Sequence, residues 1–520
     1  MPRIAGLALK YPRLSALLLG VVSALGFEPL ALWPLALLAL AGLLALLVRA
    51  PARKGAFALG WWFGLGQFTL GLNWIATAFV YQAAMPAWMG WIGVVGLSAY
   101  LAIYPGLALL AAWHFRARLT ALIPALAASW IVAEWLRGWV LTGFPWNPLG
   151  AVLLGPFDAV GAARLLPWLG TYALSGLAAL FAGLWYAGLT RFRADRRMLA
   201  LLLIPMAAQF WPQGDAGRMG SVPYVLVQPN IPQEQLNDPA FFGANFARRG
   251  DGLGQPRAGD AALVLWPESG VPDYLRDGYP PRYYADTFAA DPAQARARLA
   301  RMLGPERLLL TGAVDLEIRG DQAVGARNSI TAIDGQGAIR ASYDKAHLVP
   351  FGEYVPWREV LEPLGLARFV PGSIEFWPGP GVRTIPLGRF GKAGMGVCYE
   401  IIFPGAVADR KDRPDYIFNA SNDGWYGRWA QPQFLALARL RAIEEGLPVL
   451  RSTTTGISGV IAPDGRVVQS VPYGAAGVLL GRIPVAAAPT LFARHGNLLS
   501  LAWAALLALL SLVALRLRRE

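Results

Sequence analysis

The first 219 residues consist of long apolar stretches separated by short connectors, and this pattern constrains the fold more than any other feature. A helix needs about 20 mostly apolar residues to cross the hydrocarbon core of a bilayer. Stretches of about that length recur along the region, and one more follows near the C-terminus. They lie near residues 11–27, 30–49, 57–79, 88–112, 119–140, 165–188, 198–212 and 496–515. The sequence therefore predicts a polytopic α-helical membrane bundle of about eight spans.

The first apolar stretch has a second interpretation. Arg3, Lys10 and Arg13 precede it, as basic residues precede the apolar core of a secretory signal peptide. No clear small-residue cleavage site follows, and the next apolar stretch begins at once. We therefore predict a retained span.

The net charge of +13 would suit a nucleic-acid-binding protein, but its distribution argues against that function. Residues 220–491 contain 27 basic and 27 acidic side chains, so the whole excess lies in the apolar parts, 1–219 and 492–520. A nucleic-acid groove would place the basic residues on the polar domain. A single cysteine likewise excludes a disulfide scaffold.

Basic residues mark one side of the predicted membrane bundle. They flank the spans at one set of ends, as Arg3, Lys10, Arg13, Arg49, Arg53, Lys54, Arg116, Arg118, Arg191, Arg193, Arg196, Arg197, Arg516, Arg518 and Arg519. The opposite connectors, 80–87 and 141–162, contain no Lys or Arg. Since cytoplasmic loops carry the basic excess, both termini are expected in the cytoplasm and residues 220–491 on the far side.

Two ionisable residues, Glu134 and Arg137, fall inside the fifth predicted span, one helical turn apart. Charged groups at membrane depth are often functional. An i, i+3 pair near a helix end has a simpler explanation, which is to orient the helices of the bundle. We favour that structural interpretation.

From residue 220 the long apolar stretches end, and residues 220–491 are predicted to form one α/β domain. Helical segments are expected at Ala293–Leu303 and Gln433–Glu445, and a hairpin at Val460–Ser470 around a Pro-Asp-Gly turn. Short β-rich runs alternate with the helices. They are Val222–Gln228, Ala262–Trp266, Arg307–Ala313, Ser329–Asp334, Ala393–Val397, Tyr416–Ala420 and Val449–Thr453.

Three clusters in this domain could carry chemistry. In the first, 265–269, Glu268 lies at the end of an apolar strand, and in the third, 394–400, the only cysteine, Cys398, ends a strand before an expected helix. The second is the segment 343–354, which contains Lys345. Strand ends are where α/β domains gather their sites. A thiol at a strand-to-helix turn lies beside backbone N–H groups, which should lower its pKa and could hold an oxyanion.

Each cluster alone is weak evidence for catalysis. A lone cysteine in an α/β domain is more often an inert buried residue, Glu268 could begin a helix, and Lys345 could be a surface charge. Together they supply a base, a cation and a nucleophile, which are the roles that acyl transfer requires.

Residues 220–485 resemble the nitrilase superfamily, and the membrane flanks narrow the resemblance to the apolipoprotein N-acyltransferase family. The resemblance covers nearly the whole chain. The matching segments are Val227-Gln228-Pro229-Asn230-Ile231-Pro232-Gln233, Trp266-Pro267-Glu268, Lys345, Glu353-Tyr354-Val355-Pro356, Cys398-Tyr399-Glu400 and Ser421-Asn422-Asp423-Gly424-Trp425. It implies a catalytic α-β-β-α sandwich, which here occupies residues 220–491, between a seven-span bundle (1–219) and a C-terminal span with a basic tail (492–520).

The resemblance also implies an activity and its site. A phospholipid would donate an acyl chain, through a thioester on Cys398, to a diacylglyceryl-cysteine apolipoprotein at the bacterial inner membrane, on the periplasmic side. Glu268 would be the base, and Lys345 with the N–H of Tyr399 would stabilise the oxyanion. Glu353 would support Lys345, Tyr399 would pack on the acyl chain or the oxyanion turn, and Glu400 would hydrogen-bond behind them. No metal or cofactor is expected, because the three histidines are scattered.

One departure from the family pattern and one apolar segment bear on how the protein would contact lipid. Family members can carry a Trp shortly after the Ile-Pro-Gln run, whereas this chain has Leu236-Asn237-Asp238, so Asn237 is assigned no role. Residues 355–372 are rich in apolar side chains and directly follow the Lys345–Glu353 loop, which predicts either a lid near the membrane or a packed surface loop.

Two rival functions remain open from the sequence. A membrane-tethered amidase would use the same three residues but pass the acyl group to water. A scaffold or transporter would carry an inactive domain of this type, and the presence of Glu268, Lys345 and Cys398 disfavours it.

Overall fold

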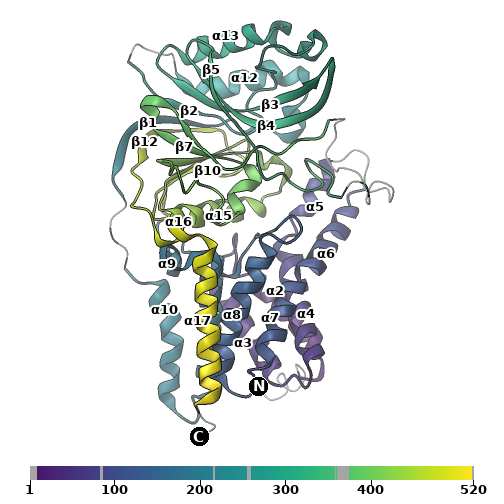
Figure 1. The fold of residues 1–520 in the computed structure, drawn as a ribbon, viewed down its shortest axis with the longest axis vertical. Helices are drawn as coiled ribbons and strands as arrows, with labels where there is room; N and C mark the ends of the chain where they lie inside the picture. The colour runs from purple at the N-terminus through teal and green to yellow at the C-terminus, as the bar shows by residue number, and fades with distance from the viewer. Residues whose placement is uncertain are drawn as a thin grey trace.

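The computed structural model describes residues 9–81, 86–212, 214, 217–254, 259–357, 359 and 374–517. These residues form a helical bundle at one end of the molecule and an α/β domain at the other (Figure 1). The first helix of the bundle begins, and the last one ends, at the end far from the α/β domain. This arrangement agrees with the prediction that both ends of the chain lie on the same side.

The bundle is formed by helices from both ends of the chain. They are α2 (Pro12–Ala24), α3 (Trp33–Val48), α4 (Arg53–Gly71), α5 (Ile75–Ala78), α6 (Met89–Leu101), α7 (Ile103–Trp113), α8 (Leu119–Arg137), α9 (Leu166–Arg191), α10 (Leu203–Gln209) and α17 (Asn497–Arg516). Apolar helices pack against one another here, and leucine and alanine dominate their buried faces.

Some of these helices match membrane spans in length and apolarity. Among the described residues, four do so: Met89–Trp113, Leu119–Arg137, Ala162–Arg191 and Asn497–Arg516. A fifth is possible if α4 and the segment Ile75–Tyr81, which are bent by 51° at their junction, form one broken span. Helices α2 and α3 are apolar but shorter. The predicted stretch 198–212 is mostly a 3₁₀ segment followed by the seven-residue α10, so the count of eight spans stays a prediction.

Exposed tryptophans ring the end of the bundle nearest the α/β domain. Trp88 directly precedes α6, Trp139 follows α8, Trp168 lies in the first turn of α9 and Trp211 follows α10, and each is more than half exposed. Tryptophan prefers the boundary between hydrocarbon and water. The α/β domain therefore lies just outside the apolar belt of the bundle (Figure 1).

The α/β domain contains two six-stranded sheets. The first has the order β12-β1-β2-β3-β4-β5 and the second the order β11-β10-β9-β8-β7-β6. Their strands are β1 (Met219–Gln228), β2 (Leu263–Leu265), β3 (Leu308–Arg319), β4 (Gln322–Asp334), β5 (Ile339–Asp344), β6 (Thr384–Pro386), β7 (Lys392–Val397), β8 (Tyr416–Ser421), β9 (Val449–Thr453), β10 (Ser458–Ile461), β11 (Val467–Val471) and β12 (Gly477–Pro484). Every predicted run is found as a strand, the hairpin at 460–470 is confirmed, and β5, β6 and β12 are additional.

Parallel pairing in both sheets decides where the functional side chains meet. Strands β1, β2 and β3 are parallel neighbours in the first sheet, as are β7, β8 and β9 in the second. The carboxyl ends of parallel strands lie at one edge of a sheet, so the residues that follow them gather there.

Helices cover the outer faces of both sheets (Figure 1). Helices α12 (Phe242–Gly250) and α13 (Pro292–Leu303) lie over the first sheet, where Ala295, Leu299 and Leu303 share a core with its strands. Helix α15 (Ala430–Glu445) lies between the second sheet and the bundle, and nearly all its side chains are buried.

Side chains of α15 bind the bundle directly. Arg439 donates hydrogen bonds to the carbonyls of Gly155, Pro156 and Ala159 at 2.7–2.9 Å. Closer to the site, the Trp146 indole N–H donates to Gln433 at 2.7 Å. These buried contacts fix the α/β domain on the bundle.

Candidate active site

Glu268 lies just after β2, with its carboxylate held from two sides. The Asn328 side-chain amide donates to one carboxylate oxygen and the Asn422 backbone N–H donates to the other, both at 2.7 Å. Burial raises the pKa of the Glu268 carboxyl, and the Lys345 cation opposes that effect. A carboxylate with a raised pKa, fixed by two donors, is suited to accept a proton near neutral pH.

Lys345 follows β5 and is 1% exposed. Its Nζ lies 2.9 Å from an oxygen of Glu353 and 4.0 Å from an oxygen of Glu268. Burial alone would lower the pKa of Lys345, but the charges of Glu353 and Glu268 outweigh it and raise that pKa above its usual value. The amine is therefore a fixed cation at the centre of the site.

Asn328, in β4, joins the two carboxylates, a role that sequence reasoning missed. Its amide nitrogen donates to Glu268 at 2.7 Å and to Glu353 at 2.9 Å, while its backbone carbonyl accepts from the Lys345 N–H at 2.8 Å. The backbone N–H of Val349 donates to the other Glu353 oxygen at 2.8 Å. The Asn328 amide thus holds Glu268 and Glu353 in place around the Lys345 cation.

Cys398 begins the turn that follows β7. Its φ of 48° places it in the left-handed region, which a side chain adopts only when its surroundings enforce it. A short 3₁₀ helix, Cys398–Ile402, follows in place of a longer α-helix. The thiol is 4% exposed, and both Glu268 and Lys345 are near enough to act on its charge.

The expected lowering of the Cys398 pKa is wrong. Burial, and then the Glu268 carboxylate, raise the pKa of the thiol well above its usual value, and the Lys345 cation offsets this only in part. The turn geometry that motivated the expectation is present, but desolvation of a buried thiolate is the larger effect. Of the two carboxylates that act on the thiol, Glu268 and Asp423, Glu268 has the larger effect.

Glu400 ties the cysteine turn to the lysine loop. One oxygen accepts from the Tyr343 hydroxyl at 3.0 Å and from the backbone N–H groups of Ala346 and His347 at 2.8 and 3.0 Å. The other accepts from the Val397 N–H at 2.7 Å. Glu400 thereby fixes Lys345 relative to Cys398, as its supporting place in the sequence motif suggested.

Tyr399 points to the bundle. Its hydroxyl donates to the Gly143 carbonyl at 3.1 Å, and its ring stacks on Phe144 at 6.3 Å between centroids. The neighbouring His347 ring lies 3.1 Å from the Thr142 carbonyl and stacks on Phe403. The bundle loop 142–144 therefore forms one wall beside the cysteine turn.

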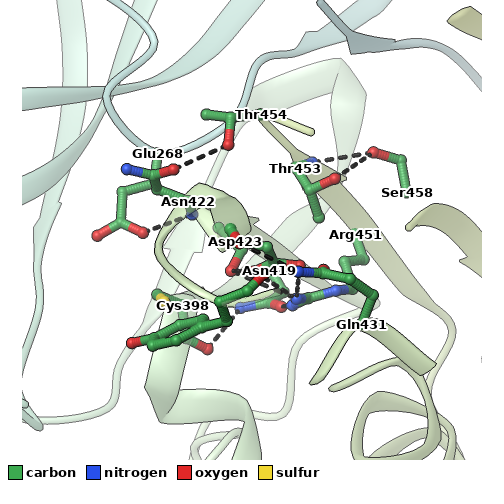
Figure 2. A network of polar contacts seen from close by, with 12 residues as sticks. Glu268, Cys398, Asn419, Asn422, Asp423, Gln431, Arg451, Thr453, Thr454 and Ser458 are labelled. Atoms are coloured by element: carbon green, nitrogen blue, oxygen red, sulfur yellow. Dashed lines mark hydrogen bonds and ion pairs between the residues drawn. The ribbon is translucent and has the colours of Figure 1, made fainter. Parts of the chain in front are cut away.

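A polar network that sequence reasoning did not single out lies behind Cys398 (Figure 2). Asn422, whose N–H binds Glu268, is held through its side chain by Gln233 and Thr454 at 3.0 and 2.8 Å. Asp423 and Arg451 form an ion pair there that is fully buried. Asn422 and Asp423 belong to the Ser-Asn-Asp-Gly-Trp motif and Gln233 to the Ile-Pro-Gln run, but nothing in the sequence marked Arg451 or Thr454.

Two expectations receive no test in the site. Most of the predicted lid, 355–372, lies outside the described residues. Among the residues that the structure does describe, no three His, Cys, Asp or Glu side chains come together to hold a metal ion.

Two family models match the chain. Residues 19–184 match the apolipoprotein N-acyltransferase N-terminal domain, and residues 237–490 match the carbon-nitrogen hydrolase domain. A protein named apolipoprotein N-acyltransferase from Rhodopseudomonas palustris is 35% identical over 96% of this chain and 95% of its own length. One of the same name from Bradyrhizobium diazoefficiens is 36% identical over 97% and 95%.

The chain belongs to the apolipoprotein N-acyltransferase family. Its α/β domain is of the nitrilase type, as the carbon-nitrogen hydrolase match shows. Solved structures that it resembles include Saccharomyces cerevisiae Nit3 (17% identity, 52% of this chain and 93% of that one, TM-score 0.37) and an amidase from Nesterenkonia (20%, 52% and 94%, TM-score 0.34). The family recognised from the sequence motifs is confirmed.

Proposed function

We propose that this member of the apolipoprotein N-acyltransferase family moves an acyl chain from a phospholipid to the α-amino group of an N-terminal diacylglyceryl-cysteine. The observation that carries the proposal is the fixed Lys345 cation between Glu268 and Glu353, beside the cysteine turn of a chain with these relatives. The architecture we infer is a nitrilase-type α-β-β-α sandwich joined to eight membrane spans.

In the first half-reaction, Glu268 takes the proton of the Cys398 thiol, and the thiolate attacks the ester carbonyl of the phospholipid. Lys345 and the Tyr399 backbone N–H stabilise the oxyanion of the tetrahedral intermediate. The intermediate collapses, the carbon–oxygen bond breaks, and Glu268 returns its proton to the departing alcohol of the lysophospholipid. An acyl thioester remains on Cys398.

In the second half-reaction, the amino group of the lipoprotein attacks the thioester carbonyl, and Glu268 takes a proton from the amine. The carbon–sulfur bond breaks, and the expelled thiolate recovers the proton from Glu268. One buried carboxylate can serve both steps, because burial raises its pKa and makes it a stronger base while two hydrogen bonds keep it in place.

The supporting residues keep this geometry. Glu353 holds the Lys345 ammonium at 2.9 Å, and Glu400 fixes the loop that carries it. Tyr399 connects the cysteine turn to the bundle through its hydroxyl. These contacts support the assignment of all three to the site.

We place the enzyme in the bacterial inner membrane, with the α/β domain in the periplasm. The basic residues at the far end of the bundle support this orientation. Both substrates are lipid-bound, so a bundle that holds the site at the membrane surface raises their effective concentration.

The test uses purified protein in detergent with phospholipid, with and without a diacylglyceryl-cysteine peptide. Acylated peptide, formed only with both lipids present, is the expected product. Release of free fatty acid at the same rate with and without the peptide would instead identify a membrane-tethered amidase-like hydrolase.

A further inference from the structure

Ser421 lies beside the catalytic cysteine in the second sheet. Strands β7 and β8 are parallel, and their paired residues include Gly396 with Asn419 and Val397 with Ala420. Ser421 is the next and last residue of β8, and Cys398 directly follows the end of β7. Ser421 is fully buried, and its side chain lies near enough to Cys398 to affect the charge of the sulfur.

The Ser421 hydroxyl also has a charged partner on its other side. It donates its single proton to one oxygen of Asp423, and its oxygen accepts from Arg451 at 3.3 Å. A hydroxyl can donate to only one acceptor at a time. The Asp423 carboxylate and a Cys398 thiolate therefore compete for the same proton.

Arg451 decides how strongly Asp423 competes. Its Nη2 lies 2.9 Å from one Asp423 oxygen and 2.7 Å from the other, and both side chains are fully buried (Figure 2). The carboxylate therefore keeps two charge-assisted hydrogen bonds when the serine proton turns away. An unpaired buried carboxylate would instead hold that proton firmly.

Arg451 also holds the cysteine turn through a second route. It donates to the side-chain oxygen of Asn419, whose amide nitrogen donates to the carbonyls of Gly396 at 3.1 Å and Cys398 at 3.5 Å (Figure 2). This contact fixes the turn in which Cys398 has its positive φ. Arg451 is thus a positioning residue for the nucleophile.

We propose that Ser421 is a further catalytic residue, which turns its hydroxyl from Asp423 to the Cys398 sulfur when the thiolate forms. Glu268 removes the thiol proton, the Ser421 O–H then donates to the negative sulfur, and no proton is transferred from Ser421. The donor matters because burial opposes the thiolate, and Lys345 offsets this only in part. The role deepens the proposed acyl transfer and rests on it for the identity of the substrate.

The test measures how fast iodoacetamide alkylates Cys398 in the full-length protein across pH, by mass. The chain has one cysteine, so one adduct reports one thiol. Ser421→Ala is compared with Ser452→Ala, a fully buried serine on β9 whose hydroxyl donates instead to the Val227 carbonyl at 2.8 Å. The other groups that act on the sulfur, Glu268, Lys345, Asp423 and Tyr426, are unchanged in both variants.

Ser421→Ala should slow alkylation at neutral pH by about ten- to a hundredfold and move the pH–rate profile to higher pH. The reason is that a hydrogen bond to a charged group stabilises the thiolate by about that factor. Ser452→Ala should leave the profile in place. A profile for Ser421→Ala that overlays the wild type would overturn the proposal. Alkylation needs no lipid, so this outcome is independent of whether the protein transfers acyl groups.

Asp423→Asn supplies a second measurement with the opposite sign. It weakens the competing acceptor and removes a negative charge that raises the pKa of Cys398, so the folded variant should be alkylated faster than wild type. General damage to the site would slow both variants. Slower alkylation of folded Asp423→Asn would contradict the competition that we infer.

Discussion

Replacing Asn328 by alanine removes the one amide that joins the two acids of the site. Its nitrogen donates to Glu268 at 2.7 Å and to Glu353 at 2.9 Å. The hydrogen bond to Glu268 lowers the pKa of that carboxyl against the larger effect of burial. Without it, the pKa of Glu268 should rise further.

The size of the effect follows from the charge on the acceptor. A hydrogen bond to a charged group contributes about 1.5–3 kcal/mol, and one pKa unit corresponds to about 1.4 kcal/mol. The pKa of Glu268 should therefore rise by about one to two units. Since Glu268 acts as a base only when deprotonated, the acid limb of the pH–rate profile moves to higher pH by the same amount.

The assay is thioester formation on Cys398 from phospholipid, followed by mass in single turnovers across pH. At pH values below the wild-type limb, Asn328→Ala should load about ten- to a hundredfold more slowly, and the difference should narrow as pH rises. Asn497→Ala, which removes an amide donor to the Pro404 carbonyl rather than to a carboxylate of the site, is the matched control. If Asn328→Ala and Asn497→Ala share one acid limb, the reasoning about Glu268 is refuted.

Three further changes test other parts of the account. Lys345→Met should slow thioester formation by about a hundred- to a thousandfold, because loss of one oxyanion donor has an effect of that size. The control Lys392→Met, which neutralises an exposed lysine, should leave the rate of thioester formation unchanged. Arg439→Leu leaves the carbonyls of residues 155–159 without their donor and should lower the free energy of unfolding by at least about 3 kcal/mol, measured by thermal unfolding in detergent. A reporter inserted within 240–260 should be active outside the cytoplasm and one fused after residue 518 inside it, and the reverse pattern would contradict the orientation.

The sequence located most strands of the α/β domain because their apolar runs are local and buried. The three that it missed carry weaker signals. Strand β6 has three residues, β5 is a half-buried edge strand of mixed polarity, and β12 is an edge strand whose middle is exposed. Hydrophobic pattern alone does not mark such edges.

Glu268, Lys345 and Cys398 could be singled out because each lies in a recognisable sequence cluster. Asn328 and Arg451 could not be found in that way, since their roles depend on which strands become neighbours. Asn328 reaches two acids only because β4 lies beside β5, and Arg451 reaches Asn419 only because β9 pairs with β8. The pKa of Cys398 was misjudged for a related reason, because burial of the thiol is set by the packed fold rather than by its local turn.

The most direct test of the central claim is the mass of the protein after incubation with phospholipid alone. Because Cys398 is the only cysteine in the chain, a hydroxylamine-sensitive adduct has one thiol to occupy. We predict a gain of one fatty acyl chain, release of about one equivalent of lysophospholipid, discharge on addition of the diacylglyceryl-cysteine peptide, and no loading of Cys398→Ala. Acylation of the peptide by Cys398→Ala would contradict the thioester mechanism and require direct transfer between the two lipids.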